Sequence, residues 1–176
     1  MRMFTALELP ERFADDVSAL ARRLEAVVEG RFVPREARHL TLAFLGDVPE
    51  ADALVAADAL EAACAGVPRI PLRAAGLGTF GRQDDATLWL GIARSPELEH
   101  LAARLRKELA ARELSFDGKP FKPHVTLARR ARIPRGDLPP LPFPLADQAE
   151  TATLFKSTLR RDGAVYEPLR SVRLVG

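Results

Sequence analysis

The chain has 176 residues, 47% hydrophobic and 28% charged, which suits a globular protein with one domain or two small lobes. Its 26 basic and 24 acidic side chains leave a net charge of +2, which excludes a protein that coats nucleic acid through bulk charge. A single cysteine, Cys64, excludes an internal disulfide framework. The apolar stretch within residues 1–9 is too short for a signal peptide or a membrane span. We therefore expect a cytoplasmic protein without membrane association.

Apolar residues at helical spacing predict three helices. The first carries a buried stripe along residues 13–27 and is expected to end at Gly30. The second occupies residues 49–64, between a proline and a Gly/Pro pair. The third begins after Ser95, whose hydroxyl can cap the helix, and buries a stripe of leucines. Each helix therefore has one face that must pack against another element.

The remaining apolar segments predict strands, which complete an α+β pattern with mainly antiparallel sheets. The expected strands are residues 1–9, 38–45, 70–74, 86–93, 121–129, 151–159, 164–169 and 171–175. Glycines and paired aspartates predict an exposed loop at residues 76–85. Five prolines predict an extended connector at residues 133–144, and residues 161–163 (RDG) predict a hairpin turn.

One pentapeptide occurs twice: HLTLA at residues 39–43 recurs as HVTLA at residues 124–128. Each copy lies in a predicted strand, where residues two apart point to the same face, so each histidine projects beside its threonine. A single copy would be interpreted as a structural histidine beside a residue chosen for strand propensity. Two copies favour a functional pair and predict two similar lobes, related by an approximate twofold axis, that face each other across a cleft.

This arrangement suits in-line displacement at phosphorus. One of the two imidazoles, His39 or His124, can act as general base while the other, protonated, acts as general acid on the opposite side of the reacting atom. The hydroxyls of Thr41 and Thr126 can donate hydrogen bonds to the phosphoryl oxygens whose charge grows in the transition state.

Charge is distributed unevenly along the chain. Residues 1–117 carry 15 basic and 19 acidic side chains, net −4, whereas residues 118–176 carry 11 and 5, net +6. Residues 118–135, around the second histidine, contain six basic residues and no acidic one. A local basic surface of this kind favours a phosphate substrate, and we expect at least one of its arginines to reach the cleft.

The sequence resembles the 2H phosphoesterase superfamily, and within it the RNA 2′,3′-cyclic phosphodiesterases, also called 2′-5′ RNA ligases. The segments that carry the resemblance are Met1–Leu7, His39–Gly46, Phe121–Arg129 and Leu154–Ser157, with Gly163 and Tyr166 in the closing hairpin. The resemblance implies one bilobal domain over residues 1–176. In it, two pseudo-symmetric lobes, each a mainly antiparallel sheet with outer helices, surround a central cleft.

The resemblance also implies an activity: metal-independent and cofactor-independent opening of RNA 2′,3′-cyclic phosphate ends to 2′-phosphates. The roles that it implies are proton donor for His39, proton acceptor for His124, and phosphate contact for Thr41 and Thr126. It favours Arg129, five positions after the second histidine, as a further phosphate ligand. Strict strand alternation would instead place Arg130 on the face of His124. Attack by a ribose 5′-hydroxyl in place of water would form a 2′-5′ linkage.

Other interpretations remain open from the sequence. The substrate could be a small cyclic nucleotide in place of RNA, or the chain could be a non-catalytic RNA-binding module, although binding alone needs no acid–base pair. A metal-dependent hydrolase is disfavoured because the motif histidines lie 85 positions apart without a carboxylate cluster. We expect a monomer. Four phenylalanines are interpreted as core residues, with base stacking as the alternative: Phe44, Phe80, Phe116 and Phe121.

Overall fold

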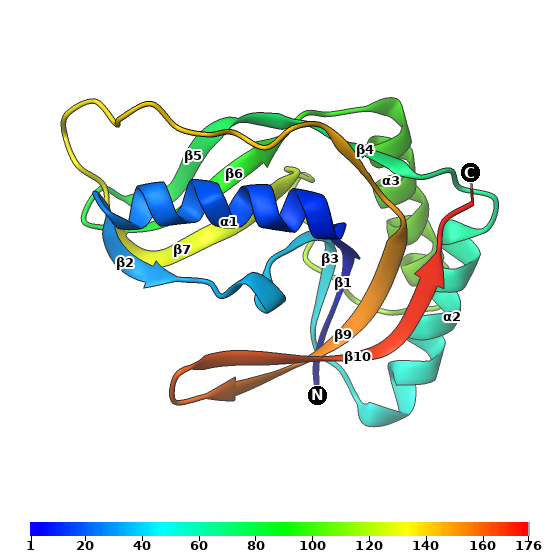
Figure 1. Cartoon of the computed structure of the whole chain (residues 1–176). Helices are drawn as coiled ribbons and strands as arrows, with labels where there is room; N and C mark the ends of the chain where they lie inside the picture. Colours follow the sequence, from blue (N-terminus) through cyan, green and yellow to red (C-terminus); the bar gives the residue numbers. More distant parts are fainter. Residues whose placement is uncertain (176) are drawn as a thin grey trace.

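The computed structural model describes residues 1–175 of the chain. This part contains ten strands and three α-helices (Figure 1). The strands are β1 (Arg2–Glu8), β2 (Glu29–Phe32), β3 (His39–Asp47), β4 (Ile70–Leu72), β5 (Ala74–Arg82), β6 (Asp85–Ile92), β7 (His124–Arg132), β8 (Asp147–Ala149), β9 (Thr151–Arg160) and β10 (Gly163–Arg173). The helices are α1 (Glu11–Glu25), α2 (Ala53–Cys64) and α3 (Pro96–Ala111), with short 3-10 turns at Arg35–Ala37 and Glu50–Asp52. The α+β prediction is confirmed.

Eight strands form one sheet in which every neighbouring pair is antiparallel. The order is β10-β9-β1-β3-β7-β6-β5, and β2 also pairs with β7. The two halves of this sheet meet at a narrow junction, because β3 and β7 pair only through Leu40 and Val125. Both residues are fully buried, and each directly follows the histidine of its repeat. The two motif strands therefore meet at equivalent positions of the repeat.

The helices cross over between the halves. Helix α1 follows β1 in the chain but contacts β2 in the other half, and α3 follows β6 but packs with α2 beside β3, while α2 also contacts β9 and β10 (Figure 1). The stripe predicted for α1 is buried along Phe13, Val17, Leu20 and Leu24. At the start of α3, the Oγ of Ser95 accepts a hydrogen bond of 3.2 Å from the amide of Leu98, as its capping role predicts.

The prediction that α1 ends at Gly30 is wrong. The helix ends at Glu25, Val27 is 43% exposed, and Gly30 lies in β2. A Cβ at Gly30 would lie 3.0 Å from the Cα of Ala131 on β7. This glycine therefore permits close approach of two strands, a role that the helical spacing before it concealed.

The loop predicted at residues 76–85 is also wrong, because most of it is strand β5, paired with β6. A Cβ at Gly78 would lie 2.1 Å from the indole of Trp89 on β6, so glycine leaves the space that this ring fills. Gly76 and Gly81 have φ angles of 82° and 91°, which side-chain-bearing residues rarely adopt. Glycine marks close packing and strand irregularity here.

The later part of the chain largely follows the prediction. Residues 133–146 contain no helix or strand, as expected for the proline-rich connector, and a turn at 161–162 joins β9 to β10. The two closing strands are a single strand, β10, with a register shift between Pro168 and Arg170. Strands β2 and β8 are additions to the predicted set. No helix of residues 1–175 is long and apolar enough to span a membrane.

Candidate active site

A cleft of about 760 Å³ contains both repeat motifs. Most of its wall comes from the sheet strands β1, β3, β7, β9 and β10 and from the segment that precedes β7, and single residues of β5, β6 and α3 also contribute to it. The five site residues predicted from the sequence all line it: His39, Thr41, His124, Thr126 and Arg129. The sheet thus brings together two motifs that are 85 positions apart.

The two imidazoles are held in the same way. Nδ1 of His39 lies 2.9 Å from the carbonyl oxygen of Ala37, and Nδ1 of His124 lies 2.6 Å from that of Lys122. A carbonyl oxygen can only accept, so each Nδ1 carries the hydrogen and donates it. The neutral rings therefore keep their lone pairs on Nε2, the nitrogen that remains for proton transfer in the cleft.

The junction between β3 and β7 places the two motifs face to face. Leu40 lies opposite Val125 in antiparallel register. The residues on either side of this pair are therefore His39 with Thr126 and Thr41 with His124. By register, the histidine of each motif thus corresponds to the threonine of the other.

Aromatic rings pack around His39 on one side of the cleft. Phe4 stacks on it with ring centroids 4.7 Å apart, and Tyr166 meets it edge-on at 5.3 Å. The pKa of His39 is lowered to about 4, mainly by burial; the hydrogen bond to the Ala37 carbonyl opposes this shift, and the charges of Arg129 and His124 add to it. The neutral ring is therefore strongly favoured at neutral pH.

His124 has a more cationic environment. Its ring meets Phe80 edge-on at 5.3 Å, and the Nζ of Lys122 lies 4.8 Å from the centroid of the Trp89 ring beside it. Burial is the main cause that lowers the pKa of His124, and the charges of Lys122 and Arg129 add to it, against the hydrogen bond to the Lys122 carbonyl. Arg129 thus acts electrostatically on both histidines.

A bulge at the same place in each motif strand selects Arg129 over Arg130. In β3 the pairing with β1 skips Leu42, and in β7 the pairing with β6 skips Leu127, each three residues after its histidine. An extra residue reverses the alternation beyond it. The fifth residue after each histidine, Phe44 or Arg129, consequently lines the cleft.

Arg130 lies elsewhere. Its φ of 51° turns the strand, and its guanidinium lies 3.9 Å from the carboxylate of Asp85. The prediction from strict alternation is therefore wrong, because the strand contains an irregularity that alternation does not include.

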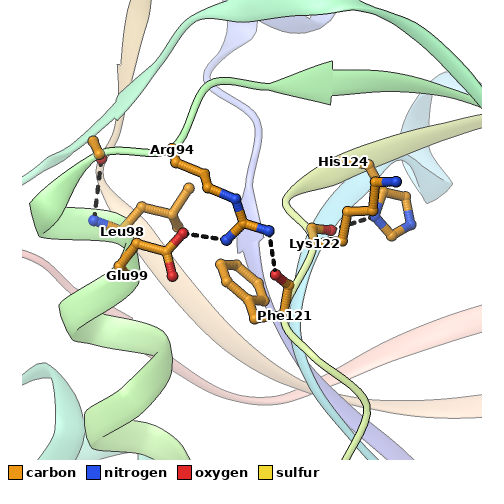
Figure 2. A network of polar contacts seen from close by, with 7 residues as sticks. Arg94, Leu98, Glu99, Phe121, Lys122 and His124 are labelled. Carbon is orange, nitrogen blue, oxygen red and sulfur yellow. Dashed lines mark hydrogen bonds and ion pairs between the residues drawn. The ribbon is translucent and has the colours of Figure 1, made fainter.

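The segment directly before His124 is linked to the start of α3 by polar contacts (Figure 2). Arg94 donates a hydrogen bond of 2.8 Å to the carbonyl oxygen of Phe121 and forms an ion pair with Glu99 on α3. The amide of Ile92 donates to the carbonyl of Pro123 at 3.1 Å. These contacts fix the backbone whose Lys122 carbonyl orients the histidine.

Several cleft residues were not among the site residues predicted from the sequence. Phe44 and Phe80 are 48% and 41% exposed and line the cleft, so their interpretation as core residues is wrong. Arg2 and Arg106 also line it. Phe44 could have been found from the repeat, because it occupies the position that corresponds to Arg129 in the second copy. Among residues 1–175, no group of three or more His, Cys, Asp or Glu side chains could hold a metal ion.

Comparison with known proteins identifies the family. The family model described as the 2'-5' RNA ligase superfamily matches residues 9–137. A curated RNA 2',3'-cyclic phosphodiesterase of Thermus thermophilus is 34% identical over 100% of this chain and 91% of its own length. The protein of the same name from Escherichia coli is 31% identical over 96% of this chain and 94% of its own.

Solved structures show the same fold. A Thermus thermophilus crystal structure has a TM-score of 0.85 at 29% identity and covers 100% of this chain and 99% of that one. E. coli LigT complexed with 3'-AMP has a TM-score of 0.81 at 28% identity and covers 99% and 98% of the two chains. Because the family model and these full-length relatives match it, the chain belongs to the 2'-5' RNA ligase superfamily.

Proposed function

We propose that this protein hydrolyses RNA 2′,3′-cyclic phosphodiester ends to 2′-phosphomonoesters without a metal ion, by acid–base catalysis between His39 and His124. The observation that carries the proposal is the matched pair of imidazoles in one cleft, each with Nδ1 held by a carbonyl oxygen and Nε2 left for proton transfer. The relatives named as RNA 2',3'-cyclic phosphodiesterases support the choice of substrate.

The proposed reaction has one displacement step. His124 takes a proton from water, and the oxygen attacks phosphorus in line with the 3′-oxygen. The bond from phosphorus to the 3′-oxygen breaks as His39 donates a proton to that oxygen, and the 2′-ester remains. The hydroxyls of Thr41 and Thr126 and the guanidinium of Arg129 bind the phosphoryl oxygens.

The charge beside His124 favours its proposed role as proton acceptor, whereas the surroundings of His39 oppose its proposed role as proton donor unless substrate is bound. Lys122 lowers the pKa of His124, in addition to burial, and so favours a neutral ring that can accept a proton. His39 must carry a proton to act as donor, although its pKa is lowered to about 4, mainly by burial. A bound phosphodiester offsets the charge of Arg129 and favours the imidazolium, so we expect substrate binding to raise the pKa of His39.

The same chemistry supports 2′-5′ RNA ligation when a ribose 5′-hydroxyl takes the place of water. A phosphodiesterase for small cyclic nucleotides would use the same residues, whereas a non-catalytic RNA-binding module would not need the paired imidazoles. We further propose that the protein acts as a monomer and, in line with its single buried Cys64, in the cytoplasm.

The decisive test is product identity. An RNA oligonucleotide that ends in a 2′,3′-cyclic phosphate is incubated with the enzyme in EDTA, and the product end is assigned by its resistance to a 3′-specific phosphatase and by ³¹P NMR. We expect a 2′-phosphate at an undiminished rate. A 3′-phosphate would reverse the leaving-group assignment, dependence on added metal would contradict the metal-independent mechanism, and no turnover would contradict the enzyme function.

A further inference from the structure

The cleft extends along the sheet beyond the catalytic residues. Across three neighbouring strands, Arg2 on β1 lies opposite Ser157 on β9, which lies opposite Tyr166 on β10, and all three residues line the cleft. Arg2 is two residues from Phe4, the residue that stacks on His39. Two residues along a strand separate their Cα atoms by roughly 7 Å, which is on the scale of one extended nucleotide.

Past this row, β9 and β10 continue without a third strand. Strand β1 begins at Arg2, so the hairpin beyond Ser157 projects from the sheet as a two-stranded arm (Figure 1). Leu159 and Ala164 lie opposite each other in the arm, on the face of Ser157 and Tyr166, and both line the cleft. Leu159 is 71% exposed, although its face continues the wall of the cleft.

The arginines at this end of the cleft form no ion pair among the described residues, although Asp47 on β3 lies opposite Arg2 in the register with β1. None of the ion pairs formed within residues 1–175 involves Arg2, nor Arg160 or Arg161 at the tip of the arm. The hairpin between β5 and β6, at the other edge of the sheet, differs because Arg82 there lies 4.0 Å from Asp84. An exposed apolar face beside unpaired arginines is complementary to an RNA strand, which has both bases and phosphates.

We propose that Arg2, Leu159 and Tyr166 form a subsite for the nucleotide that precedes the cyclic end of an RNA strand. The guanidinium of Arg2 binds the phosphate that joins the last two nucleotides, and Leu159 and the edge of Tyr166 contact the base. The inference rests on the proposed function and narrows it: the preferred substrate is an RNA strand, and a cyclic mononucleotide leaves this subsite empty.

The test compares two double variants. Arg2→Gln with Leu159→Ser removes the charge and the apolar contact from the subsite, and leaves Tyr166, which also touches His39, in place. Arg12→Gln with Leu145→Ser is the matched control, because Arg12 is exposed on α1, Leu145 is 73% exposed in the connector, and neither lines the cleft. Thermal melting checks that both variants fold.

The readout is the ratio of kcat/KM for a short RNA with a 2′,3′-cyclic end to that for 2′,3′-cyclic AMP. We expect this ratio to fall roughly tenfold in the subsite variant, as for loss of one charged hydrogen bond to phosphate, and to stay within about twofold in the control. A plot of log kcat/KM for RNA against the logarithm of the salt concentration has a negative slope. This slope should become shallower by about 0.7 in the subsite variant, as for loss of one phosphate contact.

An unchanged ratio in the subsite variant, or a wild-type enzyme that does not prefer RNA to the mononucleotide, would overturn the subsite. A wild-type enzyme that turns over neither substrate would instead contradict the proposed function. Fluorescence anisotropy with an RNA that ends in a 2′-phosphate then still tests the subsite. Weaker binding of this RNA by the subsite variant than by the control supports it, and equal binding overturns it.

Discussion

At the scale of single residues, Arg129 and Arg130 are neighbours with opposite surroundings. Arg129 lines the cleft and acts on the charge of both histidines, whereas Arg130 turns away toward Asp85. The two side chains carry the same charge. They therefore form a matched pair of test positions.

Substitution of Arg129 by glutamine should lower kcat/KM roughly 10- to 100-fold, since a charged hydrogen bond contributes about 1.5–3 kcal/mol. Arg130→Gln should leave kcat/KM within about twofold of wild type, as expected for an exposed ion pair. Steady-state kinetics on RNA with a cyclic end measure both. A larger loss for Arg130→Gln than for Arg129→Gln would contradict the placement of these arginines.

The burial of His39 has a consequence for stability at acid pH. Its pKa is lowered to about 4 in the folded protein, against 6.5 when it is unperturbed. Between these values the unfolded chain binds a proton that the folded chain does not, so stability is complete above pH 6.5 and decreases as the pH falls toward 4. Between pH 7 and pH 4, wild type should lose up to about 3 kcal/mol more free energy of unfolding than His39→Gln.

Urea unfolding of both proteins across this pH range provides the measurement. Other titrating groups, including His124, are common to wild type and His39→Gln, so the difference between the two curves isolates His39. Parallel curves would show that the folded protein does not hold this imidazole in its neutral form.

The sequence could predict the four motif residues, because a repeated His and Thr at strand spacing depends only on local geometry. It could not predict the place of Arg129 from alternation alone. The bulges at Leu42 and Leu127 arise from pairing with β1 and β6, which are distant in the chain. The exposure of Phe44 follows from the same bulge. The face of the strand on which a residue lies after such an irregularity can be assigned only from the structure.

At the scale of elements, strand β5 depends on its glycines. Gly78 leaves space for the indole of Trp89, and that indole forms part of the wall behind His124, with ring centroids 5.7 Å apart. Glycine-rich sequence therefore encodes a packed strand here, although local rules favour a loop. Apolar periodicity predicted the presence of the three helices, because it extends over several turns of each. The short strands β2 and β8, with four and three residues, carry too little pattern and were missed.

Gly78→Ala should destabilise the protein by about 1–3 kcal/mol, because the added methyl group overlaps the Trp89 ring and forces it to move. Gly136→Ala is the control, since a Cβ there meets nothing within 4 Å. Its effect should stay within about 1 kcal/mol. Urea unfolding followed by the fluorescence of Trp89, the single tryptophan, measures both. Equal stability of the two variants would contradict this packing.

At the scale of the whole molecule, the two halves share one sheet and are linked by helices α1 and α3. Strands β3 and β7 meet at Leu40 and Val125. Helix α1 follows β1, a strand of one half of the sheet, but packs on β2, a strand of the other half. Helix α1 thus joins the two halves, and α3 follows β6 but packs on β3, so unfolding of one half would disrupt helix packing on the other. We infer that residues 1–176 act as a single bilobal domain.

The expected result is one cooperative unfolding transition. Trp89 fluorescence reports on the half that contains β6, whereas far-UV circular dichroism reports on helices of both halves. The two signals should give the same midpoint and the same m-value in urea. Two separated transitions would show that the lobes are independent domains.

The central claim is that the two cleft histidines together open a cyclic phosphate. The most direct measurement is single-turnover hydrolysis of RNA with a 2′,3′-cyclic end by His39→Ala, His124→Ala and, as control, His100→Ala on the exposed face of α3. The first two variants should each be slower by roughly 10² to 10⁴, with the control at the wild-type rate. A near-wild-type rate for either cleft variant would contradict the account.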